Sequence, residues 1–393
     1  MKQAVIVGAA RTAIGKFMGS LSPMSAPEFG AVAVKAALER AGVKPGDVDE
    51  VILGNVLQAG VGQNPARQAA LKAGIPASVA SFTVNKVCGS GLKAVALATQ
   101  AIRAGDGTVY VAGGMESMTN APYMVRNARM GVRLGHTELT DVMVADGLWD
   151  VYENFHMGNT AELVAKEYSV TRQMQDEFAA MSHQKAAAAA KGGKFEKEIV
   201  TVELPQRKGP PVAFREDEGV RADSSSEGLG KLRPAFQKDG SVTAGNASQI
   251  SDGAAAVIVM EEERAKAMGL KPLARITGYA VGGVEPKWVM MAPVEAVNKL
   301  NEMRKTSVDD YDLIELNEAF SAQACAVASK LKLDPERVNV HGGAVALGHP
   351  IGASGCRILV TLLHAMADRG AKTGLATLCL GGGNAVALSV ERI

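Results

Sequence analysis

Hydrophobic positions along the chain fall into two kinds of segment that alternate. Short runs rich in β-branched residues, such as residues 4–7, 51–53 and 109–112, have the length and composition of buried strands. Longer alanine-rich stretches, such as residues 31–41 and 92–104, have the length and composition of helices. This alternation predicts a mixed or parallel sheet that is crossed over by helices.

The same alternation returns near the end of the chain. The elements predicted there are strands at 313–316, 338–341 and 374–380 and helices at 319–331 and 357–369. The two parts also share a pattern, since Ser90-Gly91 and Ser354-Gly355 each precede a helix, a strand and a run of glycines. We interpret this as a weak internal duplication, although any two strand-helix-strand units resemble each other in this way. Two α/β halves are therefore predicted.

Between the two halves the alternation is interrupted. Residues 120–243 combine a helical pattern at 160–191 with loop-like stretches rich in glycine, proline, serine and charge. A segment of this kind often covers a site on an α/β body. We therefore predict an inserted loop domain at 120–243. It would separate an N-terminal half, 1–119, which 244–270 completes, from a C-terminal half, 271–393.

Composition and charge narrow the classes of function. The 393 residues contain 42 Lys and Arg against 41 Asp and Glu, so the net charge gives no long-range attraction to nucleic acid or to an anionic membrane. No apolar stretch has the length of a membrane span, and the N-terminal residues lack the pattern of a secretory leader. The four cysteines lack CxxC spacing, which fits a reduced compartment. We expect a cytoplasmic protein with free thiols.

One cysteine occupies a position that would suit a nucleophile. Cys88 lies in NKVCGSG, residues 85–91, between a predicted strand and a helix expected from about residue 92. Unpaired backbone N–H groups and the positive end of the helix would favour the thiolate there. The flanking glycines would let a substrate approach the backbone. On this motif alone, a small buried cysteine beside a tight turn is an equally good interpretation.

Three further residues near the C-terminus could take part in chemistry. His349 lies in the glycine-rich loop at 341–355, where an imidazole could serve as a base or as a donor to an oxyanion, or could simply cap a turn. The helix after this loop is expected to begin at Cys356. Cys379 ends a predicted strand and precedes three glycines, whose N–H groups could converge on an anion. Asn317, considered alone, is best interpreted as a helix N-cap.

Two other kinds of site are not supported. The glycine after the first strand, Gly8, does not belong to a GxGxxG dinucleotide-binding loop. The six histidines and four cysteines are scattered without the spacing of metal ligands. We therefore predict neither a nicotinamide site nor a catalytic metal.

Four segments resemble, in order and separation, those of the thiolase superfamily: the ones that contain Cys88, Asn317, His349 and Cys379. The sequences GGMESM at 113–118 and GNAS at 245–248 also resemble thiolase segments, and the resemblance runs from Val5 to the C-terminus. It implies a thiolase-like fold, with two duplicated βαβαβ-type halves packed as an α/β/α/β/α sandwich. The inserted loop domain would cover a coenzyme A site.

The resemblance also implies a mechanism. Cys88 would attack an acyl thioester and become acylated while His349 assists its deprotonation. Cys379 would remove a proton from the methyl carbon of a second acyl-CoA, or protonate that carbon in thiolysis. One oxyanion would be stabilised by His349 and a water held by Asn317, and the other by the backbone N–H groups of Cys88 and Gly381. No cofactor is expected, because the thioester activates both carbons and coenzyme A is a substrate.

Contacts with coenzyme A are implied in the same way. They are Arg221 near the nucleotide, Phe236, Ala244 and Ser248 along the pantetheine arm, and His156, Met157 and Phe320 near the thioester. Considered one by one, these residues have ordinary interpretations as core side chains or as a solvated surface charge. Their assignment to the substrate therefore depends on the family pattern.

Within the family, the His156-Met157 pair resembles the acetoacetyl-CoA type, in which a methionine narrows the acyl pocket. The expected reaction is the reversible condensation of two acetyl-CoA to acetoacetyl-CoA and CoA, in fatty acid metabolism. A homodimer or homotetramer is expected by the same resemblance. The family commonly has Met-Gly-x-Gly-Pro where this chain has Met290-Met291-Ala292-Pro293. Loss of those glycines should stiffen a loop near the acyl site and bears on chain-length preference.

Three alternative functions remain open. A thiolase that prefers longer or branched 3-ketoacyl chains is the nearest. A non-catalytic acyl-CoA-binding or lipid-transfer relative would be expected to have lost a catalytic residue. A thiol-redox protein that pairs Cys88 with Cys379 would leave His349 and the glycine-rich loops without a role.

Overall fold

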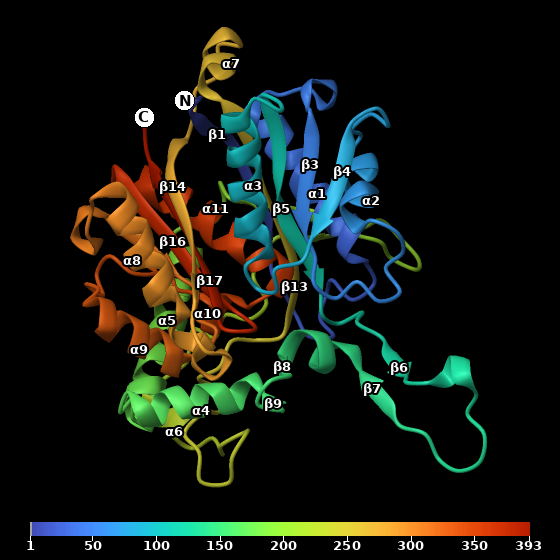
Figure 1. Ribbon diagram of the computed structural model, residues 1–393, viewed down its shortest axis with the longest axis vertical. Helices are drawn as coiled ribbons and strands as arrows, with labels where there is room; N and C mark the ends of the chain where they lie inside the picture. Colours follow the sequence, from blue (N-terminus) through green and yellow to red (C-terminus); the bar gives the residue numbers. More distant parts are fainter. Residues whose placement is uncertain (1) are drawn as a thin grey trace.

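The computed structural model describes residues 2–393, and a large mixed β-sheet runs through it (Figure 1). The N-terminal half-sheet contains β1 (Ala4–Thr12), β3 (Glu50–Gly54), β4 (Ala80–Val84), β5 (Val109–Ser117) and β13 (Ser251–Glu261). The C-terminal half-sheet contains β14 (Ala274–Gly283), β15 (Leu313–Leu316), β16 (Thr373–Leu380) and β17 (Asn384–Glu391). The strand order is β15-β16-β17-β14-β1-β13-β5-β3-β4, so each half forms one block.

The two half-sheets join at a short antiparallel contact between β1 and β14. Val5 pairs there with Arg275, and Ile6 pairs with Ala274. Within the N-terminal half, β13 lies between β1 and β5 and is antiparallel to both. β13 therefore belongs to the N-terminal half-sheet although it follows the insertion in the sequence. The division of the chain at residues 119, 243 and 270 stays a prediction.

Helices separate and cover the two half-sheets. The central layer consists of α3 (Ser90–Ala104) and α11 (Ile351–Arg369), which contact each other and strands of both halves. The outer face of the N-terminal half is covered by α1 (Ala26–Ala41) and α2 (Pro65–Lys72). The outer face of the C-terminal half is covered by α8 (Ala292–Arg304), with α9 (Ser321–Leu331) beside it. The layers follow α/β/α/β/α, and the predicted fold class is confirmed.

The repeated Ser-Gly pairs lie where α3 and α11 contact each other. A Cβ on Gly91 would come within 2.8 Å of the backbone nitrogen of Cys356, and a Cβ on Gly355 within 2.5 Å of that of Leu92. Side-chain carbons do not approach backbone atoms so closely, so the two helices need glycine at both positions. The pattern that suggested a duplication therefore marks a close helix contact in the core.

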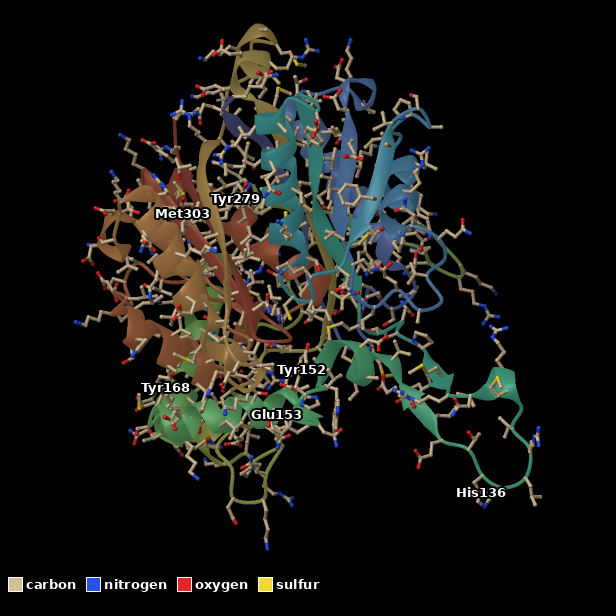
Figure 2. The ribbon with its side chains drawn as sticks, in the orientation of Figure 1. His136, Tyr152, Glu153, Tyr168, Tyr279 and Met303 are labelled. Atoms are coloured by element: carbon tan, nitrogen blue, oxygen red, sulfur yellow. The ribbon has the colours of Figure 1, made fainter. Side chains whose placement is uncertain are left out.

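Part of the insertion lies below the half-sheets in Figure 1, and the insertion extends an arm. Its main helices are α4 (Met157–Glu167) and α5 (Arg172–Lys191). The helical pattern predicted at 160–191 corresponds to these two helices, which are separate because Ser169 adopts a φ of 55° and the Thr171 side chain caps α5. The arm consists of β6 (Tyr123–Val125), β7 (Leu139–Asp141) and their connection, with His136 at its outer end (Figure 2).

Shorter elements complete the fold. They include β2 (Gly15–Lys16), β8 (Trp149–Asp150), β9 (Phe155–His156), β10 (Ile199–Val200), β11 (Val202–Leu204), β12 (Val212–Phe214), α6 (Ser226–Gly230), α7 (Glu262–Ala267), α10 (Ala344–Leu347) and the 3₁₀ segment Pro286–Met291. Two predicted helix starts are too late, because α3 begins at Ser90 and α11 at Ile351, so Cys356 lies inside α11.

The predicted strand at 338–341 is also wrong. Val338 makes an isolated bridge to Ile314, and the chain then turns at Asn339, which has a φ of 45°. The Asn339 side chain replaces a neighbouring strand, because it accepts from the N–H of Leu316 at 2.9 Å and donates to the Leu316 carbonyl at 2.8 Å. At this apolar run a side chain, and not a neighbouring strand, satisfies the backbone.

Two searches of residues 2–393 bear on partners. No helix in this range combines the length and the apolar character that crossing a membrane requires. Nor does this range contain three or more His, Cys, Asp or Glu side chains grouped so that they could hold a metal ion.

Candidate active site

A cavity of about 490 Å³ is lined by residues from both halves of the chain and from the insertion. Every residue predicted for the site except Asn317 contributes to its wall: Cys88, His156, Met157, Arg221, Phe236, Ala244, Ser248, Phe320, His349, Cys379 and Gly381. Segments that are remote in the sequence therefore meet at one place, at the ends of strands and helices of the α/β body.

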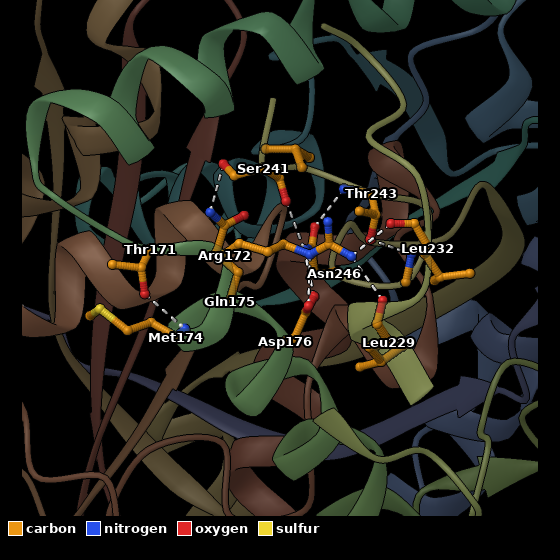
Figure 3. A network of polar contacts seen from close by, with 12 residues as sticks. Thr171, Arg172, Met174, Gln175, Asp176, Leu229, Leu232, Ser241, Thr243 and Asn246 are labelled. Carbon is orange, nitrogen blue, oxygen red and sulfur yellow. Dashed lines mark hydrogen bonds and ion pairs between the residues drawn. The ribbon is translucent and has the colours of Figure 1, made fainter. Parts of the chain in front are cut away.

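A polar network at the start of α5 holds the part of the wall formed by residues 244–248 (Figure 3). The Arg172 guanidinium contacts the Asp176 carboxylate at 2.7 Å and donates to two backbone carbonyls. Asp176 also accepts from the side chain of Asn246 at 2.9 Å. Charge-assisted hydrogen bonds of this kind fix geometry as well as adding stability. The insertion therefore positions one wall of the cavity.

Cys88 lies on a tight turn between β4 and α3. Val87 has a φ of 46°, which is a strained conformation for a β-branched residue. The Ser90 hydroxyl closes the turn, since it accepts from the N–H of Lys86 at 2.8 Å and donates to the Val87 carbonyl at 2.6 Å. Cys88 is half-buried and lines the cavity. The turn thus presents the thiol from a fixed backbone.

The thiol of Cys88 does not favour the thiolate in the resting protein. Burial raises the pKa of Cys88, and the neighbouring Cys379 raises it further. Hydrogen bonds from the backbone of Cys88 and Gly381 lower this pKa, as the sequence led us to expect, but burial outweighs them. The expectation of a stabilised thiolate is therefore wrong, and Cys88 needs a base.

His349 has the geometry of that base. Its Nδ1 atom lies 2.6 Å from Ser354 Oγ, and the Ser354 hydroxyl donates to the Pro350 carbonyl at 2.9 Å. Because the only hydroxyl proton is used in that bond, we assign the imidazole proton to Nδ1, which donates to Ser354. The Nε2 atom is then left unprotonated as the basic nitrogen.

The surroundings of His349 keep its ring neutral. Burial is the larger cause and the positive charge of Arg357 the smaller one, and together they lower the pKa of His349 to about 3. Arg357 is buried inside α11, and its guanidinium lies 3.6 Å from the Glu315 carboxylate. A neutral imidazole at neutral pH can accept a proton from a thiol.

Glu318 orients the loop that carries His349. Its buried carboxylate accepts three hydrogen bonds: from Ser182 Oγ at 2.7 Å, Asn339 Nδ2 at 2.8 Å and the N–H of Val345 at 3.1 Å. A Cβ on Gly343 would overlap this carboxylate, so the close approach of the loop requires glycine. Glu318 therefore fixes the backbone ahead of His349.

Asn317 is fully buried at the end of β15 and does not line the cavity. Within residues 2–393, neither its side-chain oxygen nor its nitrogen has a hydrogen-bond partner. The interpretation of Asn317 as a helix N-cap is wrong, because α9 begins at Ser321. A buried amide without a protein partner retains the capacity to hold a water or a substrate atom.

Cys379 lies near the end of β16, where it pairs with Ala385 of β17. Its side chain is buried, and burial raises the pKa of its thiol to about 12. Gly381, two residues further on, also lines the cavity. The second thiol is therefore protonated at rest and lies in an apolar wall of the cavity that Cys88 also lines.

Aromatic rings form another side of the cavity. The His156 ring stacks on Phe236 at a centroid distance of 4.9 Å, and Phe236 meets Phe320 edge-on at 6.2 Å. His156 also caps α4, because its Nδ1 accepts from the N–H of Gly158 at 3.0 Å. Met157 is thereby placed at the first position of α4, facing the cavity. This side of the cavity is therefore aromatic and largely apolar.

Sequence reasoning missed part of the wall. The additional side chains include Lys16, Phe17, Met118, Leu148, Ile250, Val289, Met290 and Ile351. Met290 could have been found, because the departure from the family pattern at 290–293 marks the 3₁₀ segment that carries it. No local spacing distinguishes Lys16 and Phe17, which reach the cavity through the pairing of β2 with β13.

Comparison with known proteins identifies the class to which this architecture belongs. Residues 4–263 match the family described as "Thiolase, N-terminal domain", and residues 270–392 match "Thiolase, C-terminal domain". The chain belongs to the thiolase family, as its motifs indicated.

Individual relatives are similar over their full length. The acetyl-CoA acetyltransferase of Cupriavidus necator is 60% identical over 392 residues, which covers 100% of both chains. That of Escherichia coli K12 is 58% identical over 394 residues, again with 100% of both chains covered. The crystal structure of the Bacillus anthracis acetyl-CoA acetyltransferase gives a TM-score of 0.98 at 45% identity, covering 100% of this chain and 99% of that one.

Proposed function

We propose that the protein is an acetyl-CoA C-acetyltransferase, which condenses two acetyl-CoA to acetoacetyl-CoA and CoA and catalyses the reverse thiolysis. The observation that carries this proposal is the convergence of Cys88, His349 and Cys379 on one cavity. The full-length similarity to acetyl-CoA acetyltransferases supports the choice of substrate.

In the first step, His349 Nε2 takes the proton of the Cys88 thiol as the sulfur attacks the carbonyl carbon of acetyl-CoA. The Sγ–C bond forms, the C–S bond to coenzyme A breaks, and the departing CoA thiolate takes the proton of the Cys379 thiol, which leaves Cys379 as a thiolate and His349 as an imidazolium. The raised pKa of Cys88 makes this base necessary, and the low pKa of His349 keeps the base available. The product is an acetylated Cys88.

In the second step, the Cys379 thiolate removes a proton from the methyl group of another acetyl-CoA. The carbanion attacks the acetyl carbonyl on Cys88, the C–S bond to Cys88 breaks, and the Cys88 thiolate regains its proton from the His349 imidazolium. Burial makes the thiolate of Cys379 a stronger base than an exposed thiolate, which suits removal of a proton from carbon. The oxyanions are stabilised by His349 with a water on Asn317, and by the N–H groups of Cys88 and Gly381.

We assign the remaining cavity residues to substrate binding without a cofactor. His156, Met157 and Phe320 surround the thioester, Phe236, Ala244 and Ser248 the pantetheine arm, and Arg221 the nucleotide. Met157 and Met290 both line the cavity, and their bulk favours a short acyl group.

A homotetramer or homodimer in the cytoplasm, acting in fatty acid metabolism, completes the proposal. The arm of β6 and β7 exposes the large apolar side chains of Tyr123, Met130, Val132, Leu134 and Leu139. Apolar groups on a projecting arm are characteristic of a surface that another subunit covers.

The test is thiolysis with free CoA, comparing acetoacetyl-CoA with 3-oxohexadecanoyl-CoA. We expect strong activity on the short substrate, at least about tenfold weaker activity on the long one, and no activity of Cys88→Ala on either. Strong activity on the long substrate would reassign the protein to the long-chain thiolases. A folded but inactive wild type would refute the enzymatic proposal.

A further inference from the structure

A buried carboxylate joins the two halves of the chain close to the cavity without lining it. Glu116, in the GGMESM segment near the end of β5, is fully buried and accepts four hydrogen bonds, two on each oxygen. Three come from the loop after β3: from the side chain of Asn55 at 2.7 Å and from the N–H groups of Val56 at 3.0 Å and Leu57 at 3.1 Å. The fourth comes from the N–H of Gly352 at 2.9 Å. One side chain of the N-terminal half therefore binds a helix of the C-terminal half.

The start of α11 is held by this carboxylate. The N-cap of α11 is Pro350, which has no side-chain oxygen that could accept from the N–H groups of the first turn. Glu116 accepts from one of them, the N–H of Gly352, and its negative charge suits the positive end of the helix. His349 immediately precedes Pro350. The carboxylate therefore fixes the helix end from which the backbone of His349 departs.

The start of α11 also lies directly against the backbone of β5. A Cβ on Gly352 would come within 2.7 Å of a Glu116 oxygen, and a Cβ on Gly114 would overlap the Gly352 carbonyl oxygen. Side-chain carbons do not approach other atoms so closely, so this contact needs glycine on both sides. The second glycine and the glutamate of GGMESM therefore serve the same contact.

The same carboxylate holds the loop that packs against the Cys88 turn. Val56 and Leu57 belong to an apolar cluster, and Cys88 packs against this cluster. Because Glu116 binds the N–H groups of both Val56 and Leu57, it fixes the backbone that carries these two side chains. The surroundings of the Cys88 turn and the start of the helix after His349 are therefore bound by one side chain.

We propose that Glu116 is a positioning residue, which aligns the Cys88 thiol with the His349 imidazole by binding the segments behind both. Glu116 does not line the cavity, so it acts only through these two side chains. Its effect on turnover rests on the proposed function. Proton transfer depends steeply on alignment, since a misplacement of about 1 Å can slow a reaction about a hundredfold.

The charge of Glu116 and its position have opposite effects on Cys88. Burial and Cys379 are the larger causes of the raised pKa of Cys88, and the negative charge of Glu116 adds to them. Removal of that charge alone should make the thiol more reactive. Loss of alignment with His349 should make the thiol less reactive. The direction of the change therefore distinguishes the two effects.

The experiment is a double-mutant cycle on the rate at which acetyl-CoA acetylates Cys88, measured by mass spectrometry at about pH 8.5. Burial raises the pKa of Glu116 to about 7, so the carboxylate is ionised at this pH. Glu116→Gln, which keeps the size of the side chain but turns an acceptor into a donor, is made in the wild type and in His349→Asn. The matched control is Glu162→Gln. Glu162 is also a buried carboxylate that accepts from backbone N–H groups, and it does not line the cavity.

We expect Glu116→Gln to slow acetylation about thirtyfold in the wild type, but less than about twofold in His349→Asn, where no base remains to be aligned. Glu162→Gln should change the rate by the same factor in both backgrounds. If urea denaturation shows that Glu116→Gln does not fold, Asn55→Ala replaces it, because this change removes one of the four donors and keeps the carboxylate. Asn55→Ala should slow acetylation about threefold, again only where His349 is present.

The inference would be overturned by an unchanged or faster reaction in Glu116→Gln, or by an equal loss in both backgrounds, which would mean that Glu116 only stabilises the fold. Failure of the proposed function is a separate outcome, because acetyl-CoA would then not acetylate the wild type. The same cycle is in that case run with iodoacetamide, where the Cys88 sulfur displaces iodide and His349 takes the thiol proton. A loss of rate confined to the background with His349 supports the positioning role, and an equal loss contradicts it.

Discussion

The loops that lead into the two central helices differ in what holds them. The turn before α3, which presents Cys88, is closed by its own neighbours Ser90 and Val87. The loop before α11, which presents His349, is bonded to remote parts of the chain. Its partners include Ser182, Gln249, Ser251 and Glu318.

This difference follows from what each group has to do. A nucleophile needs to be accessible, and a local turn supplies that with few contacts. A base needs its ring and tautomer fixed relative to the nucleophile, and an independently held loop supplies that. The two equivalent positions before α3 and α11 therefore serve different tasks, one presenting a nucleophile and the other a base.

The largest expected effect comes from removing the base while keeping its anchor. In His349→Asn, the amide N–H can still donate to Ser354, but no basic nitrogen remains. Acetylation of Cys88 by acetyl-CoA should slow about a thousandfold, because general base catalysis typically contributes two to four powers of ten. Mass spectrometry of quenched samples measures the acetylated protein over time.

The control for this variant is His136→Asn on the exposed arm, which should acetylate at the wild-type rate. An unchanged rate in His349→Asn would break the comparison, because the loop before α11 would then carry no base.

The second largest effect comes from weakening the hydrogen bonds that tie the loop before α11 to remote parts of the chain. Glu318→Gln keeps the size of the side chain but turns one acceptor into a donor that faces another donor. The orientation of Asn339 is fixed by its two bonds to Leu316, so it cannot adapt by flipping. We expect unfolding free energy to fall by about 2 kcal/mol and kcat by about tenfold, measured by urea denaturation and thiolysis.

Glu227→Gln is the matched change, since Glu227 forms an exposed ion pair with Lys231. This change should alter neither the free energy of unfolding nor kcat. If Glu318→Gln behaves in the same way, the loop before α11 does not depend on its remote bonds.

The smallest effect is a pH dependence of stability. Burial lowers the pKa of His349 from 6.5 to about 3, so between these values the unfolded chain binds a proton there and the folded chain does not. The stabilisation is complete above about pH 6.5, and it falls by up to about 1.4 kcal/mol per pH unit as pH decreases towards 3. The His349→Asn variant lacks this contribution to the pH dependence of the free energy of unfolding.

Urea denaturation of both proteins at pH 7, 6 and 5 measures the difference. His183, whose pKa burial lowers to about 4, contributes with the same sign to both proteins and cancels. Parallel stability curves for wild type and His349→Asn would contradict a neutral buried imidazole.

Elements could be predicted from the sequence where their pattern lies within one continuous segment. The α/β halves followed from hydrophobic periodicity, and the selection of Cys88, His349 and Cys379, which line one cavity, followed from the resemblance of their segments to the thiolase family. The strand at 338–341 failed because the Asn339 side chain, and not a strand, satisfies the backbone of Leu316.

Properties created by packing could not be predicted from the motifs. Backbone N–H groups near Cys88 lower its pKa as expected, yet the burial that outweighs them depends on the whole fold. Lys16 and Phe17 reach the cavity because β2 pairs with a strand more than two hundred residues later in the chain. Neither burial nor that pairing leaves a mark near these residues in the sequence.

The position of β13 has a consequence for protein synthesis. β13 separates β1 from β5, and it is formed by residues 251–261, after the whole insertion. While the ribosome is still translating earlier residues, both strands have an open edge that could pair with another nascent chain. The N-terminal half therefore cannot fold domain by domain as it emerges. We expect it to depend on chaperones that shield open strands until Glu261 has emerged from the ribosome.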